Sequence, residues 1–195
     1  MAVNRNVENL LTFVKFFARN TANFGYNLKT EQIMEMGEIL LHCLVASLST
    51  LVVGFIWYNP KVFGTIWMRE SGMTEEKAKG ANMAKVFGMA ILFGLMIAFF
   101  LPPIVIHQVA AMQLVGGDPS TALPSYEAFM ADYGNHHRSF GHGALHGGMA
   151  GLFLALPVIG INSMFERKSW KYILINGGYF IVTMAVMGGI ICGWK

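Results

Sequence analysis

Charged residues are scarce in this sequence: Asp, Glu, Lys and Arg make up 13% of the 195 residues, against about 25% in ordinary soluble domains. This shortage argues against a water-soluble domain and indicates a lipid environment. The basic residues form no run and the formal net charge is only +3. The pattern therefore gives no support for nucleic acid as a partner.

Cysteine is also rare, and Cys43 and Cys192 both lie in apolar stretches. Two such residues cannot build a disulfide framework, and neither belongs to a CxxC metal motif. We expect both to be small buried side chains. A secretory signal is lacking as well, because Lys15 interrupts the first apolar run and no cleavage site follows it.

Long apolar runs are what the sequence has in abundance. They predict an all-α membrane protein with four transmembrane helices in an antiparallel bundle, since about 20 apolar residues cross a bilayer. The expected spans are 39–58, 85–106, 144–165 and 172–194. Together they form a four-helix domain over 38–195, with a histidine-containing loop over 107–143.

The N-terminal segment 1–37 is expected to be an interfacial amphipathic region, because apolar residues recur at helical spacing within 7–24. A partner-binding helix is the alternative. In the second span, apolar character continues past Pro102-Pro103 to Val115, which is too long for one crossing, so we expect a break at the proline pair. Thr74-Glu75-Glu76 resembles a helix start and predicts that this helix begins well before the membrane.

The basic residues predict the orientation in the membrane, whereas the aromatic anchors bear only on which loops share a side. Loop 1 (59–84) joins the first two spans and loop 3 (166–169) joins the last two. With Lys85 and Lys171 counted on their side, these loops carry more Lys and Arg than the opposite side, so the positive-inside rule places them in the cytoplasm and both termini outside. The expected location is a bacterial inner membrane. Aromatic side chains at the ends of the spans are candidate interface anchors: Trp57, Tyr58, Trp67, Trp170 and Trp194.

Glycines recur every four residues in the last two spans. Small residues at this spacing let two helices approach closely in lipid, so the sequence predicts a helix-packing face, either within the chain or between subunits. The residues are Gly143, Gly147, Gly151, Gly189 and Gly193.

The histidines are the one group with chemical potential. The four expected spans place all six on one side of the membrane: His42, His107, His136, His137, His142 and His146. His142 and His146 are four residues apart and project from one helix face. Two imidazoles at this spacing can bind zinc, copper or iron, with His42 or His107 as a further ligand. Glu38, Glu127, Asp132 and Cys192 are expected on the same side and could complete such a site.

Other interpretations of these histidines stay open. The pair lacks the intervening Glu of the metalloprotease motif. The cofactor could be a transition metal or haem, the histidines could respond to pH, or they could be ordinary structural residues. No nucleophile elbow, phosphate loop or paired-carboxylate arrangement appears in the sequence, so no catalytic residue is assigned.

The sequence resembles a known family in two places. The first lies at the end of the first span and just after it: Gly54-Phe55-Ile56-Trp57-Tyr58-Asn59-Pro60, Phe63-Gly64 and Trp67-Met68. The second lies in the last span: Tyr179, Gly188-Gly189 and Trp194. This pattern resembles the bacterial membrane family catalogued as domain of unknown function 1761. The resemblance implies a four-helix membrane domain over about 38–195 and implies no activity.

The leading functional hypothesis from the sequence is a non-enzymatic membrane protein whose partners are the lipid bilayer and either itself or other membrane subunits. It would be a homo-oligomer or an accessory subunit of a larger complex. The first alternative is a metal- or haem-binding membrane protein that uses the histidines. The second is a small transporter formed by an oligomer.

Overall fold

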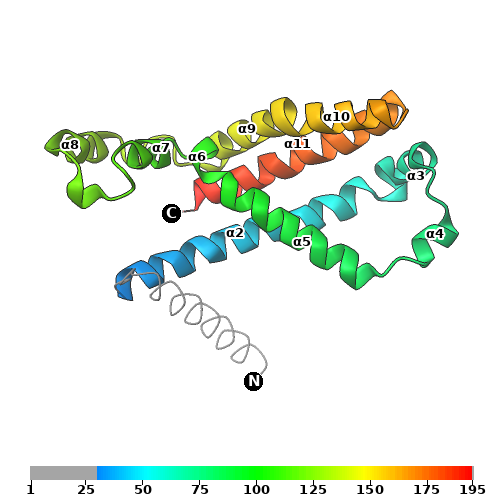
Figure 1. Cartoon of the computed structure of the whole chain (residues 1–195), viewed down its shortest axis with the longest axis horizontal. Coiled ribbons are helices and arrows are strands. Elements are labelled where there is room, and N and C mark those ends of the chain that lie inside the picture. Colours follow the sequence, from blue (N-terminus) through cyan, green and yellow to red (C-terminus); the bar gives the residue numbers. More distant parts are fainter. Residues whose placement is uncertain (1–29, 195) are drawn as a thin grey trace, which may run out of the picture. The chain divides into compact units, whose positions relative to one another are not determined.

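The computed structural model describes residues 30–194, and all regular structure in that range is helical (Figure 1). The expected interfacial helix within 7–24 lies outside the described residues. The elements are α2 (Thr30–Trp57), η1 (Pro60–Gly64), α3 (Thr65–Ser71), α4 (Glu75–Lys79), α5 (Met83–Phe100), α6 (Pro102–Val105), α7 (His107–Leu114), η2 (Pro119–Thr121), α8 (Pro124–Tyr133), α9 (Phe140–Ala150), η3 (Gly151–Ala155), α10 (Leu156–Phe165) and α11 (Trp170–Gly193).

The chain divides into two compact units, Met1–His42 and Cys43–Lys195. The boundary falls inside α2, so the greater part of this helix belongs to the second unit. The core and the tertiary contacts considered below lie within Cys43–Lys195.

Within residues 30–194, four helical segments are long and apolar enough to cross a membrane: Gly37–Trp57, Met83–Phe100, Phe140–Phe165 and Trp170–Gly193. Large apolar side chains cover their outer surfaces, with Phe55 65% and Phe100 70% exposed. In lipid such exposure carries no penalty, because the surroundings are as apolar as the side chain. The predicted all-α class with four membrane helices is confirmed.

Glycines bring the third and fourth spans into direct backbone contact. α9 and α11 run side by side in Figure 1. A Cβ on Gly143 would overlap the carbonyl oxygen of Gly188, and one on Gly147 would overlap that of Met184. On α11, Gly189 and Gly193 lie against Phe140. Gly151 continues the series, with a Cβ position 2.6 Å from the Cα of Ile181. The glycine face therefore packs within the chain.

Both cysteines are buried and free, as their apolar neighbours predicted. The Cys43 thiol lies 3.6 Å from the carbonyl oxygen of Ala98, which joins α2 to α5. Cys192 belongs to the same core, which also contains Leu101 and Met187.

The second span breaks where the proline pair predicted. α5 ends at Phe100, and Pro102 begins the single turn α6. Pro102 and Pro103 have no N–H to continue the helical ladder. Ile106 is then extended, with φ −120° and ψ 103°, and α7 begins at His107. The break sends the chain in a new direction immediately before a candidate ligand.

Two expectations about connections need correction. Thr74 does cap a helix, but α4 ends at Lys79, and Asn82 caps α5 at Met83. The second span therefore has its own start, because Gly80 and Asn82 interrupt the helix. The expected loop 107–143 is largely helical and contains α7, η2, α8 and the start of α9.

Aromatic and polar residues tie the first span to the fourth. The Trp57 indole donates to the carbonyl oxygen of Ile175 at 2.9 Å, and the Tyr58 hydroxyl donates to Asn176 Oδ1 at 3.0 Å. Burial raises the pKa of Tyr58, with smaller contributions from neighbouring tyrosines. Among the proposed anchors, Trp67 packs against Tyr58 with ring centroids 5.3 Å apart, whereas Trp170 is 69% exposed.

Loop 1 meets loop 3 through one short hydrogen bond. The Ser169 hydroxyl donates to Glu70 Oε2 at 2.6 Å, and Arg69 pairs with Glu70 at 3.0 Å. These hydrogen bonds lower the pKa of Glu70, that from Ser169 being the larger cause. Loops 1 and 3 are thus in contact at one end of the helices.

Candidate metal centre

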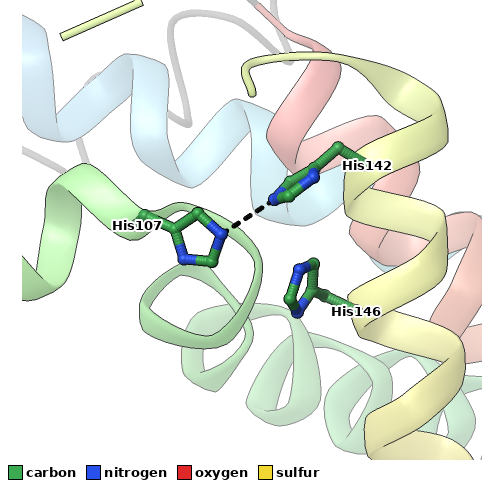
Figure 2. Close-up of side chains that lie close together, drawn as sticks. All are labelled: His107, His142 and His146. Carbon is green, nitrogen blue, oxygen red and sulfur yellow. Dashed lines mark hydrogen bonds between the residues drawn. The ribbon is translucent and has the colours of Figure 1, made fainter. Parts of the chain in front are cut away.

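Three histidines from two separate segments converge on one point. His107, His142 and His146 each offer a ring nitrogen, and these nitrogens all lie within 4.8 Å of one another. Figure 2 shows the three rings facing a common space. Their centroids are 4.9 Å (107–142), 5.0 Å (107–146) and 4.5 Å (142–146) apart. His107 Nε2 and His142 Nε2 are 3.0 Å apart, as in a hydrogen bond.

The local sequence explains how α9 presents its two histidines. Ser139 caps the helix by accepting from the His142 N–H at 3.3 Å. Position 146 then falls one turn later on the same face. On another face of the helix, Gly143 and Gly147 pack on α11. The glycine contact therefore fixes the rotation of α9, and with it the direction of both imidazoles.

His107 reaches the site because of the proline break. Val105 and Ile106 are buried beside the α9–α11 pair, and α6 contacts α9. The extended residue Ile106 then places His107 at the first position of α7, on the side of His142. A continuous helix through 102–107 would have directed this side chain elsewhere.

The dimensions fit a transition-metal ion. With Zn–N bonds of 2.0–2.1 Å in a tetrahedral site, two ligand nitrogens lie about 3.3 Å apart. The His107–His142 separation of 3.0 Å is already close to this value, and the His146 nitrogen lies within 4.8 Å of both. His142 and His146 are partly buried, and His107 is exposed.

Hydrogen bonds to the end of α11 hold the loop that precedes α9. Arg138 Nε donates to the carbonyl oxygen of Cys192 at 3.1 Å, and its Nη2 donates to that of Trp194 at 2.7 Å. These carbonyls end α11, where a cation is favoured by the helix dipole. The Cys192 thiol also donates to the His137 carbonyl at 3.4 Å.

His137 has an unusual backbone conformation within this loop. Its φ of 60° lies in the left-handed region, which non-glycine residues seldom adopt. The conformation places its ring parallel to that of His142, with centroids 4.9 Å apart and an interplanar angle of 28°. An unfavourable backbone at such a position is often associated with function.

The remaining sequence candidates lie outside the three-histidine group. Glu38 and His42 belong to the first compact unit. Glu127 and Asp132 are exposed on α8, and the buried Cys192 thiol is directed at a backbone carbonyl. Sequence reasoning did not foresee the role of Arg138, although it is the one basic residue within 107–143.

Comparison with known proteins gives one match. A family model described as "Protein of unknown function (DUF1761)" matches residues 41–192. That range contains all three clustered histidines and the four membrane helices almost completely. No curated protein and no solved structure matches the chain.

Proposed function

The chain belongs to the DUF1761 family, and we propose from its own side chains that it is a membrane protein that binds a transition-metal ion, such as Zn²⁺, through His107, His142 and His146. The observation that carries the proposal is the convergence of three ligand nitrogens within 4.8 Å. Three imidazoles with an open fourth position form one of the usual zinc-binding arrangements.

The donor set favours a particular class of ion. Imidazole nitrogens suit zinc, copper, iron and nickel, whereas calcium and magnesium prefer oxygen ligands. A bare ion also fits better than haem. Two axial histidines must leave a slot for the macrocycle between them, and ring centroids 4.5–5.0 Å apart are too close for such a slot.

A purely structural role explains the cluster less well. Exposed or partly exposed imidazoles can satisfy their hydrogen bonds with water and have no need to converge. His107 and His142 are 35 residues apart in sequence, and a proline break, a helix cap and a glycine contact all act to bring them together.

The site is proposed to lie on the outer face of a bacterial inner membrane. The basic residues favour loops 1 and 3 as cytoplasmic, and the Ser169–Glu70 hydrogen bond supports their placement on one side. The histidines lie at the other ends of the spans. Under this orientation, a reporter that is active only in the cytoplasm would be inactive when fused after Trp194. Activity of that reporter would reverse the assigned orientation.

The homo-oligomer, accessory-subunit and transporter hypotheses stay predictions beside this proposal. The homo-oligomer and accessory-subunit hypothesis drew on the glycine face, the amphipathic N-terminal segment and the lack of a catalytic motif, and the glycines named for that face contact α11 or Phe140 within the chain. Sedimentation in mild detergent would test them, since a monomer without a co-purifying partner would contradict all three.

The test of metal binding uses protein purified without a histidine tag. Mass spectrometry should find about one metal ion per chain in the wild type after gel filtration, and far less in His142→Ala/His146→Ala. His136→Gln is the matched control, because it removes an imidazole outside the cluster and should leave the metal content unchanged. Equal metal in wild type and the double variant, or none in either, would refute the proposal. A haem absorption band would refute the choice of a bare ion.

A further inference from the structure

A cavity of about 570 Å³ lies where α2 ends and α5 begins, and residues of α2, η1, α3, α5 and α11 line it. Its lining includes Tyr58, Asn59, Trp67 and Tyr179, none of which takes part in the proposed metal centre. The volume is within the range of about 300–1,000 Å³ that is usual for small-molecule sites. We propose that this cavity binds a lipid-soluble quinone, a planar ring with carbonyl oxygens and an apolar tail. The inference goes beyond the metal centre and does not depend on it.

The cavity arises from the way α2 and α5 pack on each other. A Cβ on Gly94 would lie 3.1 Å from Thr50 Cγ2 and 3.3 Å from the carbonyl oxygen of Ser47, so the two helices approach closely at this point. Nearer to the start of α5, the rings of Phe55 and Phe87 meet with centroids 5.7 Å apart. These bulky side chains keep the helices apart where Gly94 does not act, and the cavity lies between them.

Aromatic rings form a fixed wall of the cavity. The ring of Tyr58 lies with its centroid 5.3 Å from that of Trp67 and 5.2 Å from that of Tyr179. The Tyr58 hydroxyl donates to Asn176 Oδ1, and the Tyr179 hydroxyl donates to the carbonyl oxygen of Thr50, both at 3.0 Å. Because these hydrogen bonds hold the rings in place, the cavity offers preformed aromatic surfaces. Such surfaces favour a planar ring as the ligand, since aromatic groups pair by offset stacking or edge-to-face contact.

Two N–H groups in the lining are available to a ligand. Asn59 Oδ1 accepts from the backbone N–H of Lys61 at 2.9 Å, which orients the amide and leaves Nδ2 as its free end. Neither Asn59 Nδ2 nor the Trp67 indole N–H donates to any residue within 30–194. Both residues line the cavity, so a ligand that accepts hydrogen bonds suits them. Carbonyl oxygens of a quinone are acceptors of this kind.

The charge of the lining favours a neutral ligand. Among the described residues that line the cavity, none is Lys, Arg, His, Asp or Glu. A phosphate or carboxylate group would therefore lose water and gain no cation, and burial of an unpaired charge is costly. A quinone is uncharged and still has polar atoms for the two N–H donors. This difference favours a quinone over a phospholipid as the occupant.

Polar and apolar lining residues are separated along the spans. Asn59 and Trp67 lie just beyond the end of α2, at the level where indole and amide groups meet the headgroup layer of a bilayer. Leu51 and Ala90 line the cavity further into the spans. Phe55 is exposed at its edge, so a tail can leave sideways into lipid. The quinone ring is thus placed at Asn59 and Trp67, with its tail between α2 and α5.

The experiment measures binding of decylubiquinone to the full-length protein. Protein held on a resin in mild detergent is equilibrated with increasing concentrations of the quinone, and bound quinone is extracted and measured by its absorbance. The saturable part of the curve gives the Kd, because partition into micelles does not saturate. Two competitors are added in separate titrations. Decylbenzene has the same tail and a ring without carbonyls, and phosphatidylcholine supplies a phospholipid.

The test variant, Asn59→Asp, keeps the oxygen that caps η1 and removes the N–H donor. Asn82→Asp is the matched control, because Asn82 Oδ1 caps α5 by accepting from the Lys85 N–H at 3.1 Å and its side chain is not part of the lining. Both variants therefore undergo the same chemical change at a helix cap. Trp67→Phe tests the second donor and keeps an aromatic ring in the wall.

Wild type should bind about one quinone per chain, and Asn59→Asp and Trp67→Phe should each bind about tenfold more weakly, the value of one lost hydrogen bond. Asn82→Asp should bind as the wild type does, and neither competitor should displace the quinone. No saturable binding by the wild type would overturn the proposal, and so would wild-type affinity in Asn59→Asp or an equal loss in Asn82→Asp. Displacement by decylbenzene would show apolar partition without recognition of the carbonyls. Displacement by phosphatidylcholine would show a phospholipid site, and either result would refute the choice of a quinone.

Discussion

The contact between α9 and α11 can be tested by two identical substitutions on one helix. A Cβ on Gly147 would overlap the carbonyl oxygen of Met184, whereas a Cβ on Gly141 would meet nothing within 4 Å. Both glycines lie in α9, Gly141 in its first turn and Gly147 in its interior, so Gly→Ala gains up to about 1 kcal/mol of helix propensity at Gly147 and less at Gly141. A lower stability of Gly147→Ala than of Gly141→Ala therefore reports the overlap against this difference in propensity.

The expected magnitude follows from the rigidity of the obstacle. The atom in the way is backbone in the middle of a membrane helix, so relief requires α9 and α11 to move apart. Overpacking of this kind costs about 1–3 kcal/mol, which corresponds to about 2–12 °C in Tm for a chain of this size. Gly147→Ala should unfold at a lower temperature than Gly141→Ala by that amount, and Gly141→Ala should equal or exceed the wild type.

The assay is thermal unfolding of the detergent-solubilised protein, followed by circular dichroism and by intrinsic tryptophan fluorescence. Metal content should be measured on the same samples, since a displaced α9 would also separate His146 from its neighbours. Equal melting temperatures for the two variants would show that the helices do not approach through Gly147. The glycine contact could then no longer be what fixes the direction of the α9 histidines.

Three further outcomes are expected. Zn²⁺ at about 100 times its Kd should stabilise the wild type by about 2.7 kcal/mol and should not stabilise His142→Ala/His146→Ala, as thermal melts with and without the ion would show. The pKa of Glu70 is lowered because Ser169 donates a hydrogen bond to its carboxylate. The contribution of Glu70 to stability is therefore present above the pKa of the carboxyl group in the unfolded chain and is lost as the pH falls through its pKa in the folded protein. Glu70→Gln should flatten the acid side of a curve of unfolding free energy against pH, and an unchanged acid side would contradict this assignment. Arg138→Ala removes two charged hydrogen bonds to the last carbonyls of α11 and should cost about 1.5–3 kcal/mol, whereas a loss no larger than that of a surface substitution would show that the loop is held by other contacts.

The spans could be predicted because each rests on local composition. Apolar runs of about 20 residues and the absence of charge locate a membrane helix without knowledge of its neighbours. The break after Phe100 was equally local, since Pro102 and Pro103 cannot continue a hydrogen-bond ladder. The split between α4 and α5 was missed although Gly80 and Asn82 both signal it. The favourable start at Thr74 outweighed them in the sequence interpretation.

The candidate site was predictable only in part. The pairing of His142 with His146 follows from helical spacing alone. The choice between His42 and His107 as a third member depends on where the chain travels after the proline break, and that direction is set by the single extended residue Ile106. Spacing rules carry no information about such a turn. For the same reason, the stacking of His137 on His142 could not be foreseen.

The π-helical segment η3, Gly151–Ala155, lies between α9 and α10 in the third span. It determines how far α9 is rotated about the helix axis relative to α10. It ends two residues before Pro157, whose ring would clash with the preceding turn of a regular α-helix. A π segment holds one residue more than the α turn that it replaces, and one residue corresponds to about 100° of rotation. A single deletion within η3 would thus turn the histidine-bearing half of the span by about a quarter of a revolution relative to its other half. A change of one residue, remote from every imidazole, would then undo the alignment of α9 with His107.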